Sequence, residues 1–336
     1  MSFVYGPVPS RRLGLSLGIN IIPAKTCSLD CVYCQCGLTT HKTVTRESYF
    51  PVADILSAVR SAVRNSQPAT RNPQLTSRHS PSSARQSKIQ NPKSRIAFLT
   101  FSGDGEPTLN KDIGRLIRRL KREYTIPVAV ITNSTLISDP QVRRDIMPAD
   151  LIVPSLDAAD QRTFARVDRC HSSIKVEDII EGLKRFRHYY RGKMWLEIML
   201  VKGLNDSVEQ LVALRKAVHQ IQPDRVQLNT VVRPPAEKFA KPLSHDDLVQ
   251  IQCLFGPNTD IPTAAKSKVQ SPKSKVAGDP DAAIAATVSG RPVTREDIED
   301  SLGIRGATLS ASLRRLKRSK RIKPVDYWGK IFYEPA

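Results

Sequence analysis

The chain has 336 residues, of which 40% are hydrophobic and 25% charged, so it is not a disordered, collagen-like or coiled-coil protein. Its length predicts one domain of about 200 to 250 residues and a smaller second one. The 52 Lys and Arg against 32 Asp and Glu leave a net charge of +20, which favours a polyanionic partner such as nucleic acid. The sequence shows no long uncharged apolar run and no signal-peptide pattern, which predicts a cytoplasmic protein with no membrane partner.

In chain order, six strand-like apolar runs alternate with helix-like periodic segments. The expected strands are 17–22, 96–101, 128–132, 151–155, 195–201 and 226–231. The expected helices are 51–64, 109–123, 139–147, 174–190 and 206–221, with Ser138 and Asp206 as the starts of two of them. Strands at this spacing are parallel and joined by right-handed crossovers. Residues 1–255 are therefore predicted to form an α/β fold, a partial (β/α)6 TIM-like barrel.

Two segments lack the composition of a folded core. Residues 65–95 are rich in Ser, Pro, Gln, Asn and Arg, which predicts a disordered insertion within the barrel domain. The segment 87–94 recurs almost unchanged at 267–274, and two copies are too few for a solenoid. Duplicated linker sequence is the favoured interpretation, with a docking motif as the alternative. The second copy falls in a predicted linker, 256–280.

The pattern changes again after this linker. Thr294 is a candidate N-cap for a helix that ends near Gly303, and a second helix is expected at 307–319. The runs 321–325 and 330–334 then look like the two strands of a hairpin. A helix, a turn, a helix and a hairpin predict a C-terminal winged-helix domain at 281–336.

The second of these helices has two different faces. Leucines share one face, namely Leu309, Leu313 and Leu316. Arginines share the other, namely Arg314, Arg315 and Arg318. Such a helix can pack inward and present guanidinium groups to phosphates, which fits a nucleic acid such as tRNA. A solvated basic face, or a winged helix that docks a protein, remains the alternative.

Three cysteines, Cys27, Cys31 and Cys34, follow the first predicted strand, where ligands collect at the mouth of a parallel barrel. Clustered cysteines in a chain without a secretion signal bind metal more often than they form disulfides. Three thiolates can hold three irons of a [4Fe–4S] cluster and leave the fourth open to a small molecule. The alternative is a zinc site completed by His41. The other cysteines, at positions 36, 170 and 253, are scattered, so no auxiliary cluster is expected.

The cysteine spacing, with Tyr33 before the third cysteine, resembles the signature of the radical S-adenosylmethionine (SAM) superfamily. The segments 6–14 and 25–27 resemble its Fe–S oxidoreductase branch, which is related to tRNA wyosine synthesis. The resemblance covers roughly residues 10–235. It implies that a reduced [4Fe–4S] cluster splits SAM and that a 5′-deoxyadenosyl radical abstracts hydrogen from a substrate. It also implies an electron donor such as flavodoxin or ferredoxin. The extra N-terminal cysteines of the demethylwyosine-forming family are absent, which counts against that reaction.

The loop after the second strand resembles the superfamily's Gly-Gly-Glu motif, although Asp104 interrupts the glycine pair. Glycines let a backbone pass close to a ligand, and a carboxylate can accept hydrogen bonds from an ammonium group. The resemblance implies that Gly105 and Glu106 hold the methionine amino group of SAM, with Gly103 sharing that role.

Polar residues also end the later strands. Asn133, Ser155 and Asp157 suit the ribose hydroxyls and the methionine carboxylate of SAM, although such residues are also common turn formers. Four residues on the last two strands are candidate substrate contacts inside the barrel, because a buried polar group needs a partner. They are Glu197, Lys202, Gln227 and Asn229.

The sequence thus predicts a radical SAM enzyme that abstracts hydrogen from an unidentified substrate, with RNA modification among the reactions that fit. One alternative is a non-catalytic metal-binding regulator that binds nucleic acid. Another is an activase that acts on a partner protein.

Overall fold

The structure is a computed structural model that describes residues 3–10, 12–66, 96–262 and 279–336. The predicted insertion at 65–95 lies outside the described residues apart from Asn65 and Ser66. Both copies of the repeated segment and most of the predicted linker also lie outside them.

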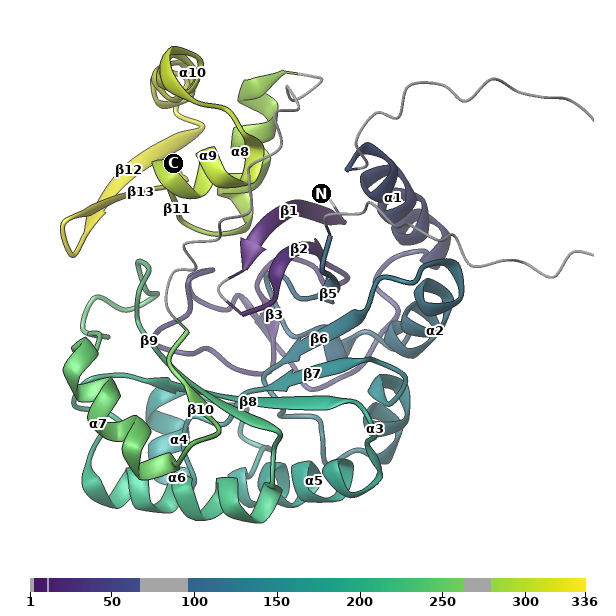
Figure 1. Ribbon diagram of the computed structural model, residues 1–336, viewed down its shortest axis with the longest axis vertical. Helices are drawn as coiled ribbons and strands as arrows, with labels where there is room; N and C mark the ends of the chain where they lie inside the picture. Colours follow the sequence, from purple (N-terminus) through teal and green to yellow (C-terminus); the bar gives the residue numbers. More distant parts are fainter. Residues whose placement is uncertain (1–2, 11, 67–95, 263–278) are drawn as a thin grey trace, which may run out of the picture.

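One eight-stranded sheet forms the larger part of the molecule, in the order β1-β2-β5-β6-β7-β8-β9-β10. Its strands are β1 (Val4–Ser10), β2 (Gly14–Ile19), β5 (Phe98–Phe101), β6 (Val128–Thr132), β7 (Leu151–Pro154), β8 (Lys193–Leu200), β9 (Arg225–Thr230) and β10 (Thr259–Asp260). From β2 to β10 all neighbours are parallel. Within the described residues the two edge strands do not pair with each other, so the sheet curves into a partial barrel, as predicted (Figure 1).

The six predicted strands correspond to β2 and β5 to β9, and the two edge strands were missed. β1 runs antiparallel to β2 and contains Pro7 and Pro9. Proline has no N–H for a sheet, and it is tolerated here because β1 lies at an edge. β10 is only two residues long and lies inside the predicted linker, where it pairs with β9. The first part of that segment therefore belongs to the sheet.

Helices cover the outer face of this sheet (Figure 1). They are α1 (Val52–Asn65), α2 (Ile113–Glu123), α3 (Pro140–Ile146), α4 (Gln161–Val167), α5 (Val176–Tyr189), α6 (Val208–Ile221) and α7 (His245–Phe255). α4 and α7 were not predicted. The side chains of Asp139 and Ser207 cap α3 and α6, one residue later than expected in each case. No helix in the described residues is long and apolar enough to cross a membrane.

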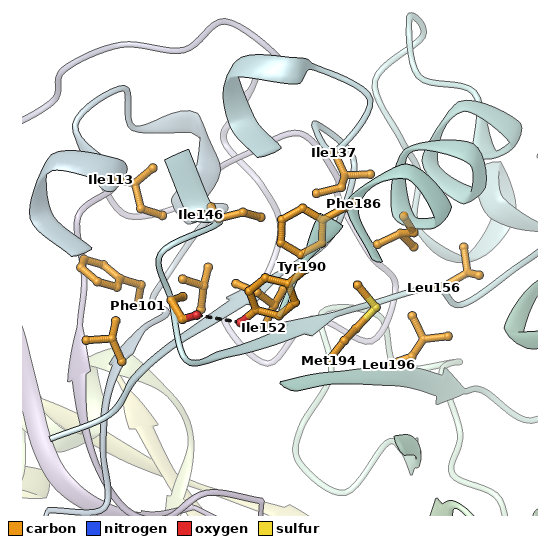
Figure 2. Close-up of a cluster of buried hydrophobic side chains, with 14 of the residues drawn as sticks. Phe101, Ile113, Ile137, Ile146, Ile152, Leu156, Phe186, Tyr190, Met194 and Leu196 are labelled. Atoms are coloured by element: carbon orange, nitrogen blue, oxygen red, sulfur yellow. Dashed lines mark hydrogen bonds between the residues drawn. The ribbon is translucent and has the colours of Figure 1, made fainter. Parts of the chain in front are cut away.

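Alternate strand residues point outward and form the main core with the helices. Figure 2 shows part of this core, where Phe186 and Tyr190 pack over Ile152. Phe186 and Tyr190 stack with their ring centres 4.7 Å apart, and the Tyr190 hydroxyl donates to the Ala149 carbonyl at 2.9 Å. These contacts fix α5 against β7 and so hold the strand ends that precede the functional loops.

The strand residues between them point into the barrel. An apolar layer comprises Leu13, Ala129, Leu151 and Val153. Further along the strands the interior is polar, with Ser16, Thr100, Glu197, Gln227 and Asn229 all buried. A barrel whose interior changes from apolar to polar toward the carboxyl ends of its strands is suited to hold a polar ligand there.

The C-terminal residues form a second unit with its own core. Its elements are α8 (Pro280–Gly290), β11 (Val293–Thr294), α9 (Arg295–Leu302), α10 (Gly306–Arg318), β12 (Ile322–Tyr327) and β13 (Lys330–Pro335). Thr294 caps α9 in a capping box, and Gly303 ends it with φ +67°, as the sequence predicts. α8 and β11 were not predicted. The sheet order is β11-β13-β12. The identification of this unit as a winged helix stays a prediction.

The two faces of α10 are as predicted, and one of the arginines is paired. Leu309, Leu313 and Leu316 are buried, and Arg314 and Arg318 are exposed. Arg315 is also exposed, and it forms a bidentate ion pair with Asp281 of α8, at 2.7 and 2.8 Å. Arg315 therefore lies on the predicted outer face, but its guanidinium already has a carboxylate partner within the unit.

This ion pair predicts an acid-sensitive C-terminal unit. Hydrogen bonds from Arg315 lower the pKa of Asp281 to about 2. A depressed carboxyl pKa stabilises the fold above the unfolded-state pKa of about 4, and that stabilisation is lost as the pH falls toward 2. We expect Asp281→Asn to speed hydrogen exchange of α8 and α10 at pH 7 but not at pH 2. Equal exchange in both proteins at pH 7 would contradict the role of the pair.

The C-terminal unit packs against the barrel beside β1 (Figure 1). Arg233, just after β9, donates to the Pro292 carbonyl at 2.5 Å and pairs with Asp297 at 3.3 Å. The Tyr327 hydroxyl donates to the Val231 carbonyl at 3.3 Å. The segment before β11 is therefore fixed next to the carboxyl end of β9.

Candidate metal centre

The three clustered cysteines lie on one loop that leaves the sheet after β2. The loop begins at β3 (Thr26–Cys27), which pairs with β4 (His41–Lys42). Main-chain hydrogen bonds join it to the end of α4, from Asp30 N to Asp168 O and from Val32 N to Val167 O, both at 3.0 Å. Within the loop, Cys34 N donates to Cys31 O at 3.0 Å. The backbone thus fixes the loop without help from the sulfur atoms.

Each of the three sulfurs is partly buried and has a polar neighbour. The Asn133 amide donates to Cys27 Sγ at 3.4 Å, and Cys31 Sγ donates to an Asp168 carboxylate oxygen at 3.3 Å. Burial raises the pKa of Cys27 to about 12 and that of Cys31 well above its usual value. A hydrogen bond from Cys36 instead lowers the pKa of Cys34. In a cluster, hydrogen bonds to coordinating sulfurs tune the metal.

This donor set fits an iron–sulfur cluster better than a zinc ion. In a cubane each cysteine binds a different iron, and metal binding displaces the thiol protons. A single zinc ion needs four ligands that converge on one point. In the described part of the chain no three His, Cys, Asp or Glu side chains converge in that way. His41 is exposed on β4, so no zinc site is preformed around it.

A buried acid network lies behind Cys31. The Tyr33 hydroxyl donates to Asp157 and lies 3.2 Å from an Asp168 oxygen. Burial raises the pKa of Asp157 to about 6, and burial together with Asp157 raises that of Asp168 well above its usual value. Sequence reasoning missed Asp168, which follows the unpredicted helix α4.

The glycine loop after β5 packs directly on the start of the cysteine loop. Lys25 N donates to Asp104 O at 2.7 Å, and Glu106 N donates to Thr26 O at 3.2 Å. A Cβ atom on Gly105 would lie 2.0 Å from Thr26 O, and one on Gly103 would lie 2.4 Å from Asn20 Oδ1. Both glycines are needed for this close approach.

Gly105→Ala is therefore expected to destabilise the cysteine loop, although it changes none of the cysteines. The new methyl group would collide with a main-chain oxygen, which cannot rotate away as a side chain can. We expect a loss of about 2 to 3 kcal/mol in the free energy of unfolding and a lower iron content after reconstitution. Urea unfolding and iron assay measure both effects. Normal stability and iron content in Gly105→Ala would show that the two loops do not pack as described.

Glu106 is hydrogen-bonded to other groups of the protein, whereas the sequence predicts that it binds the ammonium group of SAM. It is only 2% exposed. One carboxylate oxygen accepts from Thr108 N, Thr108 Oγ1 and Thr132 Oγ1, at 3.0, 2.5 and 2.7 Å. The other accepts from Asn133 N at 2.7 Å. Burial raises the pKa of Glu106, although these hydrogen bonds oppose the shift. The carboxylate therefore joins the ends of β5 and β6.

The other three predicted SAM contacts lie in different surroundings. The amide nitrogen of Asn133 contacts Cys27 and also donates to Ser28 Oγ at 3.0 Å. Ser155 is partly buried at the end of β7, where its main-chain N–H donates to Thr132 O at 2.9 Å. Asp157 is buried beneath Cys31 in the acid network. Asn133 and Asp157 thus lie on two sides of the cysteine loop.

Inside the barrel, three of the four candidate substrate contacts are buried. Glu197 forms an ion pair with Arg12, which the sequence reading did not single out, and accepts from Asn229 Nδ2 at 2.8 Å. Gln227 Oε1 and Asn229 Oδ1 are buried acceptors with no hydrogen-bond partner in the described residues. Lys202 is exposed, so it does not point into the barrel. Buried acceptors without donors favour a ligand that supplies N–H or O–H groups.

Comparison with known proteins agrees with this arrangement. The family model of the radical SAM superfamily matches residues 21–214, which include the cysteine loop, the glycine loop and four of the eight barrel strands, β5 to β8. The chain is 32% identical to the UPF0026 protein MJ1312 of Methanocaldococcus jannaschii, over 99% of this chain and 96% of that protein. It is 37% identical to GTPase Obg of Brachyspira hyodysenteriae over 77% of this chain, which spans only 34% of that relative.

A solved structure shows the same fold. It is a radical SAM methyltransferase from Sphaerobacter thermophilus, with a TM-score of 0.51 and 17% identity over 73% of this chain and 65% of that one. The superfamily consists of enzymes that use a [4Fe–4S] cluster and SAM, which confirms both predicted cofactors. The chain belongs to the radical SAM superfamily and, by its full-length relative, to the UPF0026 proteins.

Proposed function

We propose that this protein cleaves SAM reductively and directs the resulting radical to a hydrogen atom of a substrate held in the barrel. The observation that carries the proposal is the juxtaposition of the cysteine loop with the glycine loop and Asn133, above a polar interior. We assign the cluster to Cys27, Cys31 and Cys34. When bound, the cluster supplies the electron that breaks the carbon–sulfur bond of SAM.

The protein's own residues would prepare this site in two ways. The main-chain bonds of the cysteine loop hold the backbone that carries the three sulfurs, which reduces the entropy lost on metal binding. The Asn133 amide hydrogen bond to Cys27 Sγ stabilises negative charge on that sulfur. Burial, together with the nearby Asp157 carboxyl, raises the pKa of Asp168, which favours its protonated form beside Cys31 and reduces the negative charge behind the site.

For SAM, we assign the backbone around Gly103 and Gly105 and the side chains of Asn133 and Ser155 as direct contacts. Glu106 and Asp157 belong to the same region. In this proposal they position the contacting residues and do not touch SAM. Glu106 already accepts four hydrogen bonds, and Asp157 already accepts from Tyr33 and Met199. SAM would then meet main-chain atoms whose positions these two buried carboxyl groups determine.

The substrate would enter the polar part of the barrel. Gln227 and Asn229 offer acceptor oxygens without donors, and a substrate with N–H or O–H groups would satisfy them. Exclusion of water matters because a reactive radical is otherwise quenched by side reactions. We include an electron donor such as flavodoxin or ferredoxin, and nucleic acid at the exposed Arg314 and Arg318 of α10, as partners in this proposal.

Product analysis tests the proposal. The reconstituted protein, reduced with dithionite under anaerobic conditions, should convert SAM to methionine and 5′-deoxyadenosine. A protein that binds iron and SAM but forms neither product under these conditions would refute it. With a mixture of candidate substrates, transfer of deuterium from a labelled substrate to 5′-deoxyadenosine would identify the hydrogen donor.

A further inference from the structure

A cavity of about 200 Å³ joins the cluster loop, the barrel interior and the C-terminal unit. Cys36, which is hydrogen-bonded to the cluster ligand Cys34, lines it from the loop. Ser102, Gly103 and Asp104 line it from the end of β5. Thr287 and Arg291 of the C-terminal unit close it from above β1. The smaller unit thus forms part of the cavity wall beside the proposed radical site.

The position of Arg291 is fixed by the docking contact described above. Its neighbour Pro292 accepts the hydrogen bond from Arg233 at 2.5 Å, and Arg233 also pairs with Asp297. β11 begins at Val293 and pairs with β13. Arg291 is therefore held between the barrel and a strand of the C-terminal unit, so its side chain begins at a defined point on the cavity wall.

Two arginines line this cavity, and they differ in their partners. Arg12 is paired with Glu197. Arg291 is partly buried and forms no ion pair or hydrogen bond with any described residue. Asp104 lines the same cavity, yet it forms no ion pair with Arg291 within the described chain and accepts instead from Asn20 at 3.4 Å. A partly buried guanidinium that is not paired with a carboxylate leaves positive charge in a confined polar space.

We propose that Arg291 binds an anionic group of the substrate, a phosphate or a carboxylate, and that the C-terminal unit thereby completes the substrate site. A guanidinium matches the geometry of both groups through paired N–H donors. Tyr5 and Ser102, whose hydroxyls are 2.6 Å apart, offer further hydrogen bonds on the same wall. That the bound anion belongs to the substrate rests on the proposed function. The binding of an anion by Arg291 does not depend on that function.

The test is titration of inorganic phosphate into the reconstituted holoenzyme already saturated with SAM, followed by calorimetry. Wild-type protein and Arg321→Gln, which removes an exposed arginine of the same unit, should bind phosphate with equal affinity. Arg291→Gln should bind it about 10- to 100-fold more weakly, and Arg291→Lys should recover part of the loss. The affinity for SAM should be the same in all four proteins.

Several outcomes would overturn this inference. One is the absence of saturable phosphate binding to the wild-type holoenzyme, and another is equal phosphate affinity in Arg291→Gln. A loss of SAM affinity with unchanged phosphate affinity would show that Arg291 serves SAM instead. Cleavage of SAM without substrate is measured in parallel. If that cleavage fails while phosphate binding depends on Arg291, the proposed function is wrong and the anion site stands.

Discussion

We expect replacement of any one of Cys27, Cys31 and Cys34 with Ala to abolish SAM cleavage, because each thiolate is expected to hold one iron. We expect the rate of 5′-deoxyadenosine formation to fall by roughly a hundredfold or more, together with the iron content. Chromatography of the dithionite-driven reaction measures the rate. The main-chain bonds of the loop do not involve these sulfurs, so the apoprotein should still fold.

Cys253→Ala is the matched control. Cys253 is exposed on α7, away from the cluster loop in sequence, and its loss should change neither the iron content nor the cleavage rate. Cys36 provides a more demanding control, because it contacts Cys34 but is not one of the three predicted cluster ligands. Cys36→Ala should retain the cluster. Retained cleavage in Cys31→Ala, or a cluster lost only with Cys36, would show that the ligands are assigned incorrectly.

Glu106→Gln is expected to destabilise the protein strongly. The carboxylate accepts four hydrogen bonds from Thr108, Thr132 and Asn133. The amide keeps only one acceptor oxygen, so its N–H₂ group must face at least one donor that then lacks an acceptor. The free energy of unfolding should fall by about 3 kcal/mol, since each buried donor left without a partner costs about 1 to 3 kcal/mol. Urea unfolding of the apoprotein measures the change without any contribution from iron or SAM.

Asp104→Asn serves as the control for that variant. Asp104 lies in the same loop, but it is less buried than Glu106 and accepts only long hydrogen bonds, from Asn20 at 3.4 Å and from Cys36 Sγ at 4.0 Å. Its loss should cost less than about 1 kcal/mol. The prediction from the sequence was that Glu106 holds the methionine amino group. Unchanged stability of Glu106→Gln, combined with weaker SAM binding, would support that earlier interpretation over the one drawn from the hydrogen bonds.

The parts of the fold that could be predicted are those with a strong local signal. β6 and the other central strands are short runs of apolar, often β-branched residues, which is the pattern typical of buried strands. The start and the end of α9 can be predicted from its capping residue, Thr294, and from the glycine that ends it, Gly303. β1 could not be predicted because its prolines argue against a strand unless it is known to lie at an edge. α4 has seven residues, as α3 has, but it lacks the proline that marks the first turn of α3.

The residues of the candidate site also fall into those with a local sequence signal and those without one. Cys27, Cys31 and Cys34 are close in sequence, so their spacing alone could identify them. Arg12 and Arg291 depend on contacts between segments far apart in the chain, and no local pattern distinguishes them from other arginines. The pairing of Arg315 with Asp281 is of the same kind. Tertiary packing decides which charges are available to a ligand and which are already neutralised.

The C-terminal unit also has a larger role in this account than the sequence suggested. The sequence predicts a separate module that recruits a macromolecule. In the structure its residues Thr287 and Arg291 line a cavity that reaches the cluster loop. Removal of residues 282–336 would therefore open this cavity to solvent as well as remove α10. Loss of substrate turnover in a truncated protein would reflect both effects, which is why single substitutions such as Arg291→Gln are more informative.

The most direct test of the central claim is electron–nuclear double resonance on the reduced, reconstituted protein with isotopically labelled SAM. The account predicts hyperfine coupling from ¹⁵N in the amino group and ¹⁷O in the carboxylate of SAM, because three cysteines leave one iron open to that ligand. Absence of both couplings, together with a fourth protein-derived ligand on the cluster, would contradict the account.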